Sequence, residues 1–151
     1  MPRVTQINIR FLFVCHGNLI HSASRTQGSV AMSSAESELY ALCTATSEGI
    51  FLRSLMDEAG MSRGKVRPNI FTDSSAAKSI VSRVGPGKRS KHTHMKYLFM
   101  QELNIDGQIK MHTVASMMNT ADIMAKYLTG DHTQRLSRVL RLQAVHPDQQ
   151  L

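Results

Sequence analysis

The chain has 151 residues, 42% of them hydrophobic, and a formal net charge of +7 at pH 7. This length is typical of one domain with a buried core, and no apolar run approaches the roughly 20 residues of a membrane-spanning helix. The first residues lack the long apolar segment of a signal peptide, and two cysteines, Cys15 and Cys43, are too few for a metal knuckle or a disulfide framework. We therefore expect an intracellular protein, cytoplasmic or nuclear, that is not secreted, has no membrane partner and keeps its thiols reduced.

The first element expected is a β-hairpin over residues 7–25. Two runs rich in strand-forming residues flank a turn at residues 16–18, and Gly-Asn in this position is a good hairpin signal. A short polar stretch then leads towards a helix.

The longest element expected is that helix, from Ser33 to about Ala59. Ser33 and Glu36 have the spacing of a capping box at its start, and Gly60 supplies the stop. Glu38 lies at the edge of the apolar stripe of this helix, so we expect its carboxylate to be only partly in water. A solvated helix glutamate is the usual case for this residue type, and that alternative stays open.

Residues 69–80 predict a short strand followed by a helix, with Asp73 at the junction. In open α/β sheets the carboxyl ends of the strands form the rim where ligands and catalysis concentrate. Alternatively, Asp73 is only the N-cap of the helix, which is the favoured interpretation of this residue taken alone because Asp is strongly preferred at caps.

A basic segment follows directly. Residues 74–101 contain six Lys and Arg residues and no acidic residue, whereas the whole chain has 18 basic and 11 acidic residues. A solvated surface is the ordinary explanation of such a run, but its clustering behind Asp73 favours a polyanionic partner, namely nucleic acid. The candidate nucleic-acid-binding residues are Arg83, Lys88, Arg89, Lys91, His92 and Lys96.

The remaining elements are shorter. The helix after Asp73 should end near Val84, because Gly-Pro-Gly follows, and another helix is expected from about His92 to Leu103. Alternating residues predict a strand over residues 109–114.

Two helices are expected near the C-terminus. The first covers residues 121–126 and stops near Gly130, with Asp122 in its first turn, where a negative charge favours the helix dipole. The second covers residues 133–142 and is followed by a polar tail.

Three carboxylates, those of Glu38, Asp73 and Asp122, would thus stand at a helix edge, a strand end and a helix start. One end of a sheet could gather all three. Hard divalent cations such as Mg²⁺ are held by a few carboxylates together with substrate phosphates. Such a cluster beside a basic segment indicates metal-assisted phosphodiester chemistry.

Five segments between residues 11 and 128 match one known family in the right order. They are Gly17-Asn-Leu-Ile20, Ser33-Ser-Ala-Glu-Ser-Glu-Leu-Tyr-Ala-Leu42, Phe71-Thr-Asp-Ser-Ser-Ala76, Arg89-Ser-Lys-His92 and Asn119-Thr-Ala-Asp-Ile123. Together they resemble the ribonuclease H domain of copia-type LTR retrotransposon Pol polyproteins. The resemblance implies a mixed α/β fold, with a five-stranded sheet flanked by helices. It also implies hydrolysis of the RNA strand of RNA–DNA hybrids with two Mg²⁺ ions.

The resemblance also implies roles for single residues. Glu38 is similar to the family's helix glutamate and Asp73 to its strand-end aspartate, which would both bind the water-activating ion. Asp122 is similar to the late-helix aspartate, which would bind the leaving-group ion. Glu36 is then the capping residue. The segment 89–92 resembles a basic motif that would contact phosphate.

One departure from the family pattern is serious. The family's first strand contains another aspartate that touches both ions, and this strand lies beside the strand of the Asp73 equivalent. No Asp or Glu occurs here before Glu36. The resemblance therefore implies the C-terminal portion of the domain, with a mixed sheet that lacks the first strand. We expect this truncated domain over residues 1–130, followed by a C-terminal helix and polar tail over residues 131–151.

Alternative functions follow from that departure. The first is a ribonuclease H-like domain whose activity is weak or lost in this chain, with Mg²⁺ bound weakly at most. The second is a catalytically silent remnant of a Pol polyprotein that binds nucleic acid or is merely structural. A basic interaction domain unrelated to polynucleotides is more distant. The expected partners are an RNA–DNA hybrid, the rest of a Pol polyprotein, or a second copy through open strand edges.

Overall fold

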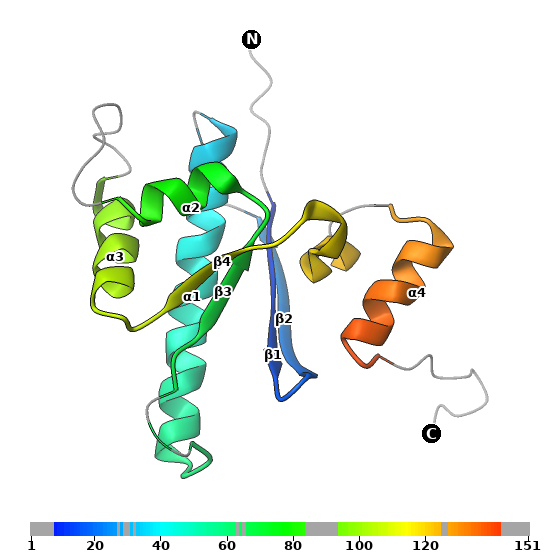
Figure 1. Ribbon diagram of the computed structural model, residues 1–151, viewed down its shortest axis with the longest axis horizontal. Helices are drawn as coiled ribbons and strands as arrows, with labels where there is room; N and C mark the ends of the chain where they lie inside the picture. The colour runs from blue at the N-terminus through cyan, green and yellow to red at the C-terminus, as the bar shows by residue number, and fades with distance from the viewer. Residues whose placement is uncertain are drawn as a thin grey trace. The chain divides into compact units, whose positions relative to one another are not determined.

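A computed structural model of the chain describes residues 8–26, 28, 31, 33–62, 64, 66–83, 94–124 and 127–142. These residues form helices and small sheets, so the mixed α/β class expected from the sequence is confirmed. The chain divides into two compact units: unit 1 comprises Met1–Ile9 and Thr26–Asn119, and unit 2 comprises Arg10–Arg25 and Thr120–Leu151. The position of one unit relative to the other is not determined (Figure 1). In the described part of the chain, no helix has the length and apolar character needed to cross a membrane.

Unit 1 contains a two-stranded parallel sheet of β3 (Asn69–Thr72) and β4 (Lys110–Thr113). The residue pairs run from Asn69 opposite Lys110 to Thr72 opposite Thr113. The strand expected over residues 109–114 is confirmed as β4. Because the strands are parallel, their carboxyl ends lie at the same edge of the sheet.

Helix α1 (Ser34–Glu58) begins and ends where the sequence predicts. The Ser33 hydroxyl accepts a hydrogen bond from the Glu36 backbone N–H at 3.2 Å, which satisfies one of the free donors of the first turn. At the other end Gly60 has a φ of 68°, a left-handed conformation that glycine adopts without strain. The Met61 N–H then donates to the Met56 carbonyl at 2.9 Å, which closes a Schellman motif.

Two shorter helices complete unit 1, α2 (Ser75–Val81) and α3 (His94–Ile105). The N-cap of α2 is Ser74, whose hydroxyl accepts a hydrogen bond from the Ala77 N–H at 3.1 Å. The interpretation of Asp73 as the N-cap is therefore wrong. The helix α3 begins and ends two residues later than predicted, and the expected end of α2 near Val84 lies outside the described residues.

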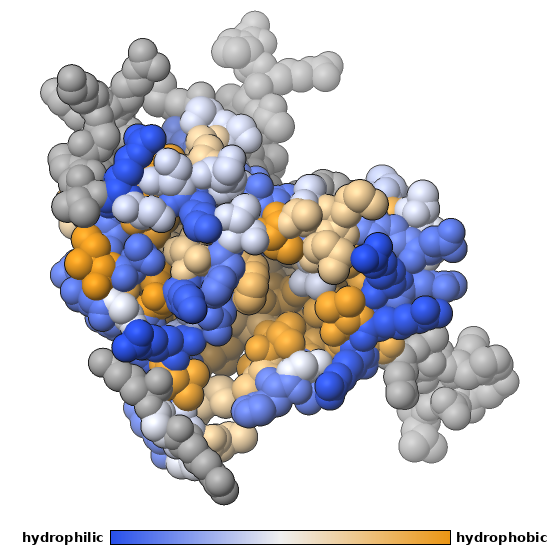
Figure 2. Space-filling model, viewed as in Figure 1, coloured by the Kyte–Doolittle hydropathy of each residue, from blue (hydrophilic) through white to orange (hydrophobic). Residues whose placement is uncertain are grey.

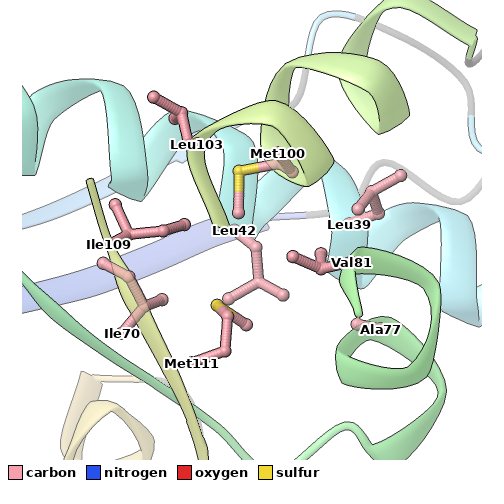
Figure 3. Close-up of a cluster of buried hydrophobic side chains, with 9 residues drawn as sticks. All are labelled: Leu39, Leu42, Ile70, Ala77, Val81, Met100, Leu103, Ile109 and Met111. Carbon is pink, nitrogen blue, oxygen red and sulfur yellow. The ribbon is translucent and has the colours of Figure 1, made fainter. Parts of the chain in front are cut away.

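The core of unit 1 is formed by buried side chains from all three helices and both strands (Figure 3). Alternate residues of β3, Ile70 and Thr72, face this core, while Asn69 and Phe71 are exposed on the other side. The Gln101 side chain of α3 donates a hydrogen bond to the Ile80 carbonyl at 3.0 Å, which joins α3 to α2. The core residues are Leu39, Leu42, Ile70, Ala77, Val81, Met100, Leu103, Ile109 and Met111.

The predicted hairpin is confirmed as β1 (Asn8–Cys15) and β2 (Asn18–Thr26). Its turn residues His16 and Gly17 have φ values of 50° and 78°. Two successive positive φ angles are typical of the type I′ turn, whose twist matches that of the paired strands.

The C-terminal part of unit 2 differs from the prediction. The residues Thr120–Met124 form a 3₁₀ helix, η2, where an α-helix was expected, and a second 3₁₀ helix, η1 (Ser116–Met118), precedes it in unit 1. Helix α4 (Gly130–Val139) starts at the glycine that was expected to stop the preceding helix. Extended backbone at Thr129, with φ −64° and ψ 154°, places its carbonyl to accept the Thr133 N–H at 2.9 Å, so the first turn forms at the glycine.

Candidate functional site

Asp73 lies at the carboxyl end of β3, as the sequence predicts, and is half-buried. The turn that holds it is fixed on both sides. The Val114 N–H donates to the Thr72 carbonyl at 2.9 Å, and the Ser74 N–H donates to the Thr72 hydroxyl at 3.1 Å. Among the described residues, no hydrogen bond or ion pair involves the Asp73 carboxylate. This edge of a parallel pair is the place where α/β sheets bind ligands.

Glu38 lies in the second turn of α1 and is half-buried, as expected from its position beside the apolar stripe. The neighbouring side chains Leu39 and Leu42 are in the core, and they fix the rotation of α1 about its axis. Glu38 and Leu42 are four residues apart and therefore lie on the same side of the helix. The core of unit 1 thus holds the Glu38 carboxylate at its margin.

Asp122 belongs to η2 of unit 2 and is only 7% exposed. The relative position of the two units is not determined, so the approach of Asp122 to Glu38 and Asp73 remains a prediction. Within the ranges that the structure describes, no group of three or more His, Cys, Asp or Glu residues could hold a metal ion.

The predicted nucleic-acid-binding set lies partly outside the described residues, because Lys88, Arg89, Lys91 and His92 are not among them. Arg83 is exposed after the end of α2, and its guanidinium donates a hydrogen bond to the Ser79 hydroxyl at 3.3 Å. Lys96 is half-buried, with its ammonium 3.8 Å from the centroid of the Tyr40 ring. This contact gives Lys96 a structural role that the sequence did not predict.

Lys96 lies beside a polar cluster on α1 that comprises Glu36, Tyr40 and Cys43. Tyr40 is buried and donates a hydrogen bond to the Glu36 carboxylate at 3.0 Å. Burial raises the pKa of Tyr40 above its usual value of 10.0, and the hydrogen bond to Glu36 raises it further. Burial also raises the pKa of the Cys43 thiol, and the positive charge of Lys96 lowers it by a smaller amount. The spacing of Glu36 and Tyr40, one helical turn, could have indicated this pair from the sequence.

An open groove of about 450 Å³ lies next to this cluster on α1. It is lined by Cys43, Thr44, Ser47, Glu48 and Phe51. None of the three candidate carboxylates lines it, so the groove is separate from the predicted site.

Comparisons with known proteins found a relative among retrotransposon polyproteins. No family model and no solved structure matches the chain. Over 116 residues, the chain is 27% identical to the retrovirus-related Pol polyprotein from transposon TNT 1-94 of Nicotiana tabacum. This match covers 77% of the chain but only 9% of the Nicotiana tabacum protein. The chain is thus related to a small part of a retrotransposon Pol polyprotein, as its sequence motifs predict.

Proposed function

We propose that the chain is a ribonuclease H-like domain of a copia-type Pol polyprotein. On this proposal the 151 residues by themselves bind nucleic acid but hydrolyse RNA–DNA hybrids weakly or not at all. The observation that carries the assignment is the position of Asp73 at the carboxyl end of a parallel strand pair. Its neighbour Ser74 caps the next helix, so the helix start does not account for Asp73. The similarity to a Pol polyprotein over most of the chain supports the same conclusion.

The residues of unit 1 suit a hard divalent cation, because Glu38 and Asp73 offer carboxylate oxygens and are both half-buried. We assign Mg²⁺ to these two residues of unit 1, and Asp122 of unit 2 is a further ligand only by the family resemblance. When bound, Mg²⁺ would activate a water molecule and stabilise the leaving oxygen. The contribution of the chain itself is to hold the two carboxylates of unit 1 in place, through the core contacts of α1 and the hydrogen bonds around Thr72.

We expect weak hydrolysis of RNA–DNA hybrids because the residues before Glu36 include no Asp or Glu that could bind the metal ions. Two-ion hydrolysis requires the ions about 3.5–4 Å apart, and a ligand that touches both ions positions them. The resemblance implies such a ligand on a strand that these residues do not provide. Without metal, carboxylates placed together also repel one another and favour protonation.

The second candidate is a catalytically silent remnant that associates through its strand edges or binds nucleic acid. The sheet topology favours it, since β3 and β4 form a sheet of two strands in the described part of the chain, and each has one edge without a partner strand there. Open edges are sites where further strands add.

The decisive assay is Mg²⁺-dependent cleavage of a labelled RNA–DNA hybrid by the purified chain. We expect little or no cleavage, and cleavage after a strand containing an aspartate is supplied at the free edge of β3. The variant Asp73→Asn tests the site, and Asp57→Asn, at an exposed position of α1, is the matched control. Robust cleavage by the chain alone that Asp73→Asn abolishes would contradict the expected weakness, and cleavage equal in both variants would contradict the site.

Binding is tested separately by titration with the uncleaved hybrid in EDTA at several salt concentrations. Contacts with phosphates release counterions, so affinity should fall steeply with salt. Charge reversal at Lys88, Arg89 and Lys91 should weaken binding strongly. Reversal at Arg138, an exposed residue of α4, measures the effect of one reversed charge, and three times this effect is expected from net charge alone. Unchanged affinity after the triple reversal would place the nucleic-acid site elsewhere.

A further inference from the structure

The two faces of the β3–β4 sheet differ sharply. One face is buried in the core of unit 1, whereas the residues of the outer face are exposed or, for His112, half-buried, and they lie outside the site proposed above. Figure 2 shows hydrophobic residues exposed among hydrophilic ones on the face in view. Phe71 of the outer face is an exposed hydrophobic residue, with 62% of its surface accessible to solvent. The outer face consists of Asn69, Phe71, Lys110 and His112.

The aromatic ring at the centre of this outer face is held in a fixed orientation. Phe71 lies directly opposite His112 in the strand register, and their rings are stacked with centroids 4.9 Å apart and planes 20° from parallel. The His112 ring is fixed in turn by a hydrogen bond of 2.9 Å between its Nε2 and the Asn69 Oδ1. One side of the Phe71 ring thus contacts the imidazole, and most of the residue remains accessible to solvent.

The charge at one end of the outer face is positive. Lys110 is exposed two residues before His112, on the same side of the strand. The exposed guanidinium of Arg67 lies next to Gly107, in the turn that precedes β4. Asp106 in the same turn offsets part of this charge. An aromatic ring with a lysine on the same face of the sheet is complementary to a base linked to a phosphate.

We propose that the outer face of the β3–β4 sheet binds an unpaired nucleobase of a single-stranded nucleic acid. The base stacks on the open side of Phe71, and Lys110 contacts the adjoining phosphate. Base–aromatic stacking tolerates any sequence, because every base has a π-face. A paired duplex has its base faces covered, so the outer face discriminates in favour of single strands. The inference rests on the proposed function only in taking nucleic acid as the partner.

The experiment measures the affinity of the full chain for a fluorescent single-stranded oligouridine of about 12 nucleotides, by fluorescence anisotropy. The variant Phe71→Ala should weaken binding about 5- to 150-fold, the range found when a stacking aromatic is removed. The variant Phe71→Tyr keeps a ring and should bind as the unchanged chain does. Phe51→Ala is the matched control, since Phe51 is 63% exposed on α1, outside the outer face.

The salt dependence separates stacking from phosphate contact. The fold loss of affinity caused by Phe71→Ala should be the same at every salt concentration. Lys110→Ala should instead make the slope of log affinity against log salt concentration shallower by about 1, the contribution of one phosphate contact. Equal affinity of Phe71→Ala, Phe51→Ala and the unchanged chain would overturn the proposal, and so would the absence of any binding to single strands. Light scattering that shows self-association abolished by Phe71→Ala, with oligouridine affinity unchanged, would assign the outer face to a second copy and also overturn it.

These outcomes can be told apart from failure of the proposed function. Loss of oligouridine binding in Phe71→Ala, with no binding or cleavage of the hybrid by the unchanged chain, would support the outer-face site and contradict the ribonuclease H-like assignment. Hybrid binding that depends on the basic segment, with no effect of Phe71→Ala on oligouridine binding, would support the ribonuclease H-like assignment and contradict the outer-face site.

Discussion

Removing the charge of Lys96 tests whether this residue supports the fold or contacts nucleic acid. The Lys96 ammonium lies 3.8 Å from the centroid of the Tyr40 ring, and Tyr40 is only 7% exposed. A cation–π contact contributes about 0.5–1 kcal/mol at exposed sites and about 2 kcal/mol when desolvated. Lys96 is half-buried, so we expect Lys96→Met, which keeps the aliphatic stem, to reduce the free energy of unfolding by about 1 kcal/mol. In a domain of this size, that change lowers Tm by about 2–4 °C.

A double-mutant cycle assigns the effect to the contact itself. Urea unfolding of Lys96→Met, Tyr40→Leu and the double variant should give a coupling energy of about 1 kcal/mol. Arg138→Met is the control, because Arg138 is an exposed residue of α4 that makes no ring contact among the described residues. The reasoning is refuted if Lys96→Met leaves stability unchanged but weakens hybrid binding as much as charge reversal in the basic segment. Lys96 would then act only as a nucleic-acid ligand.

Two further predictions concern the core of unit 1 and the thiols. Leu39→Ala should reduce stability by about 2–5 kcal/mol, because Leu39 is 0% exposed and its removal leaves a cavity. Leu55→Ala on the same helix, at a residue 51% exposed, should change stability by less than about 0.5 kcal/mol in the same denaturation assay. In a Cys15→Ser background, Cys43 should react with iodoacetamide at pH 8 more slowly than free cysteine, since its raised pKa lowers the thiolate fraction. A faster reaction would show that Lys96 outweighs burial.

The parts of the fold that the sequence predicts correctly are those decided by local chemistry. The turn at Gly17 requires positive φ, the start of α1 requires a hydroxyl acceptor at Ser33, and its end requires the left-handed conformation of Gly60. Each of these demands can be met by only a few residue types, so the residue identifies the conformation. The strand before Asp73 was predictable for a similar reason, because strand-forming residues meet a helix start there.

The features that the sequence does not predict depend on residues far apart in the chain. The stack of Phe71 on His112 requires the register of β3 against β4, and the contact of Lys96 with Tyr40 requires the packing of α3 on α1. The 3₁₀ conformation of η2 was missed because its residues suit an α-helix equally well, and local preference is weaker than tertiary context. The joint position of Glu38, Asp73 and Asp122 likewise depends on the arrangement of the two units.

The junction after β3 leads to the last prediction, because Asp73 and Ser74 are both residue types preferred at helix N-caps. The structure gives the cap to Ser74, whose hydroxyl accepts the Ala77 N–H, so the helix start does not need the Asp73 carboxylate. Ser74→Ala should therefore reduce the free energy of unfolding by about 1 kcal/mol, while Asp73→Asn should change it by less than about 0.5 kcal/mol. Thermal denaturation of both variants measures this contrast. A destabilisation by Asp73→Asn as large as that by Ser74→Ala would mean that Asp73 supports the fold, and Asp73→Asn would no longer be a specific probe of the proposed site.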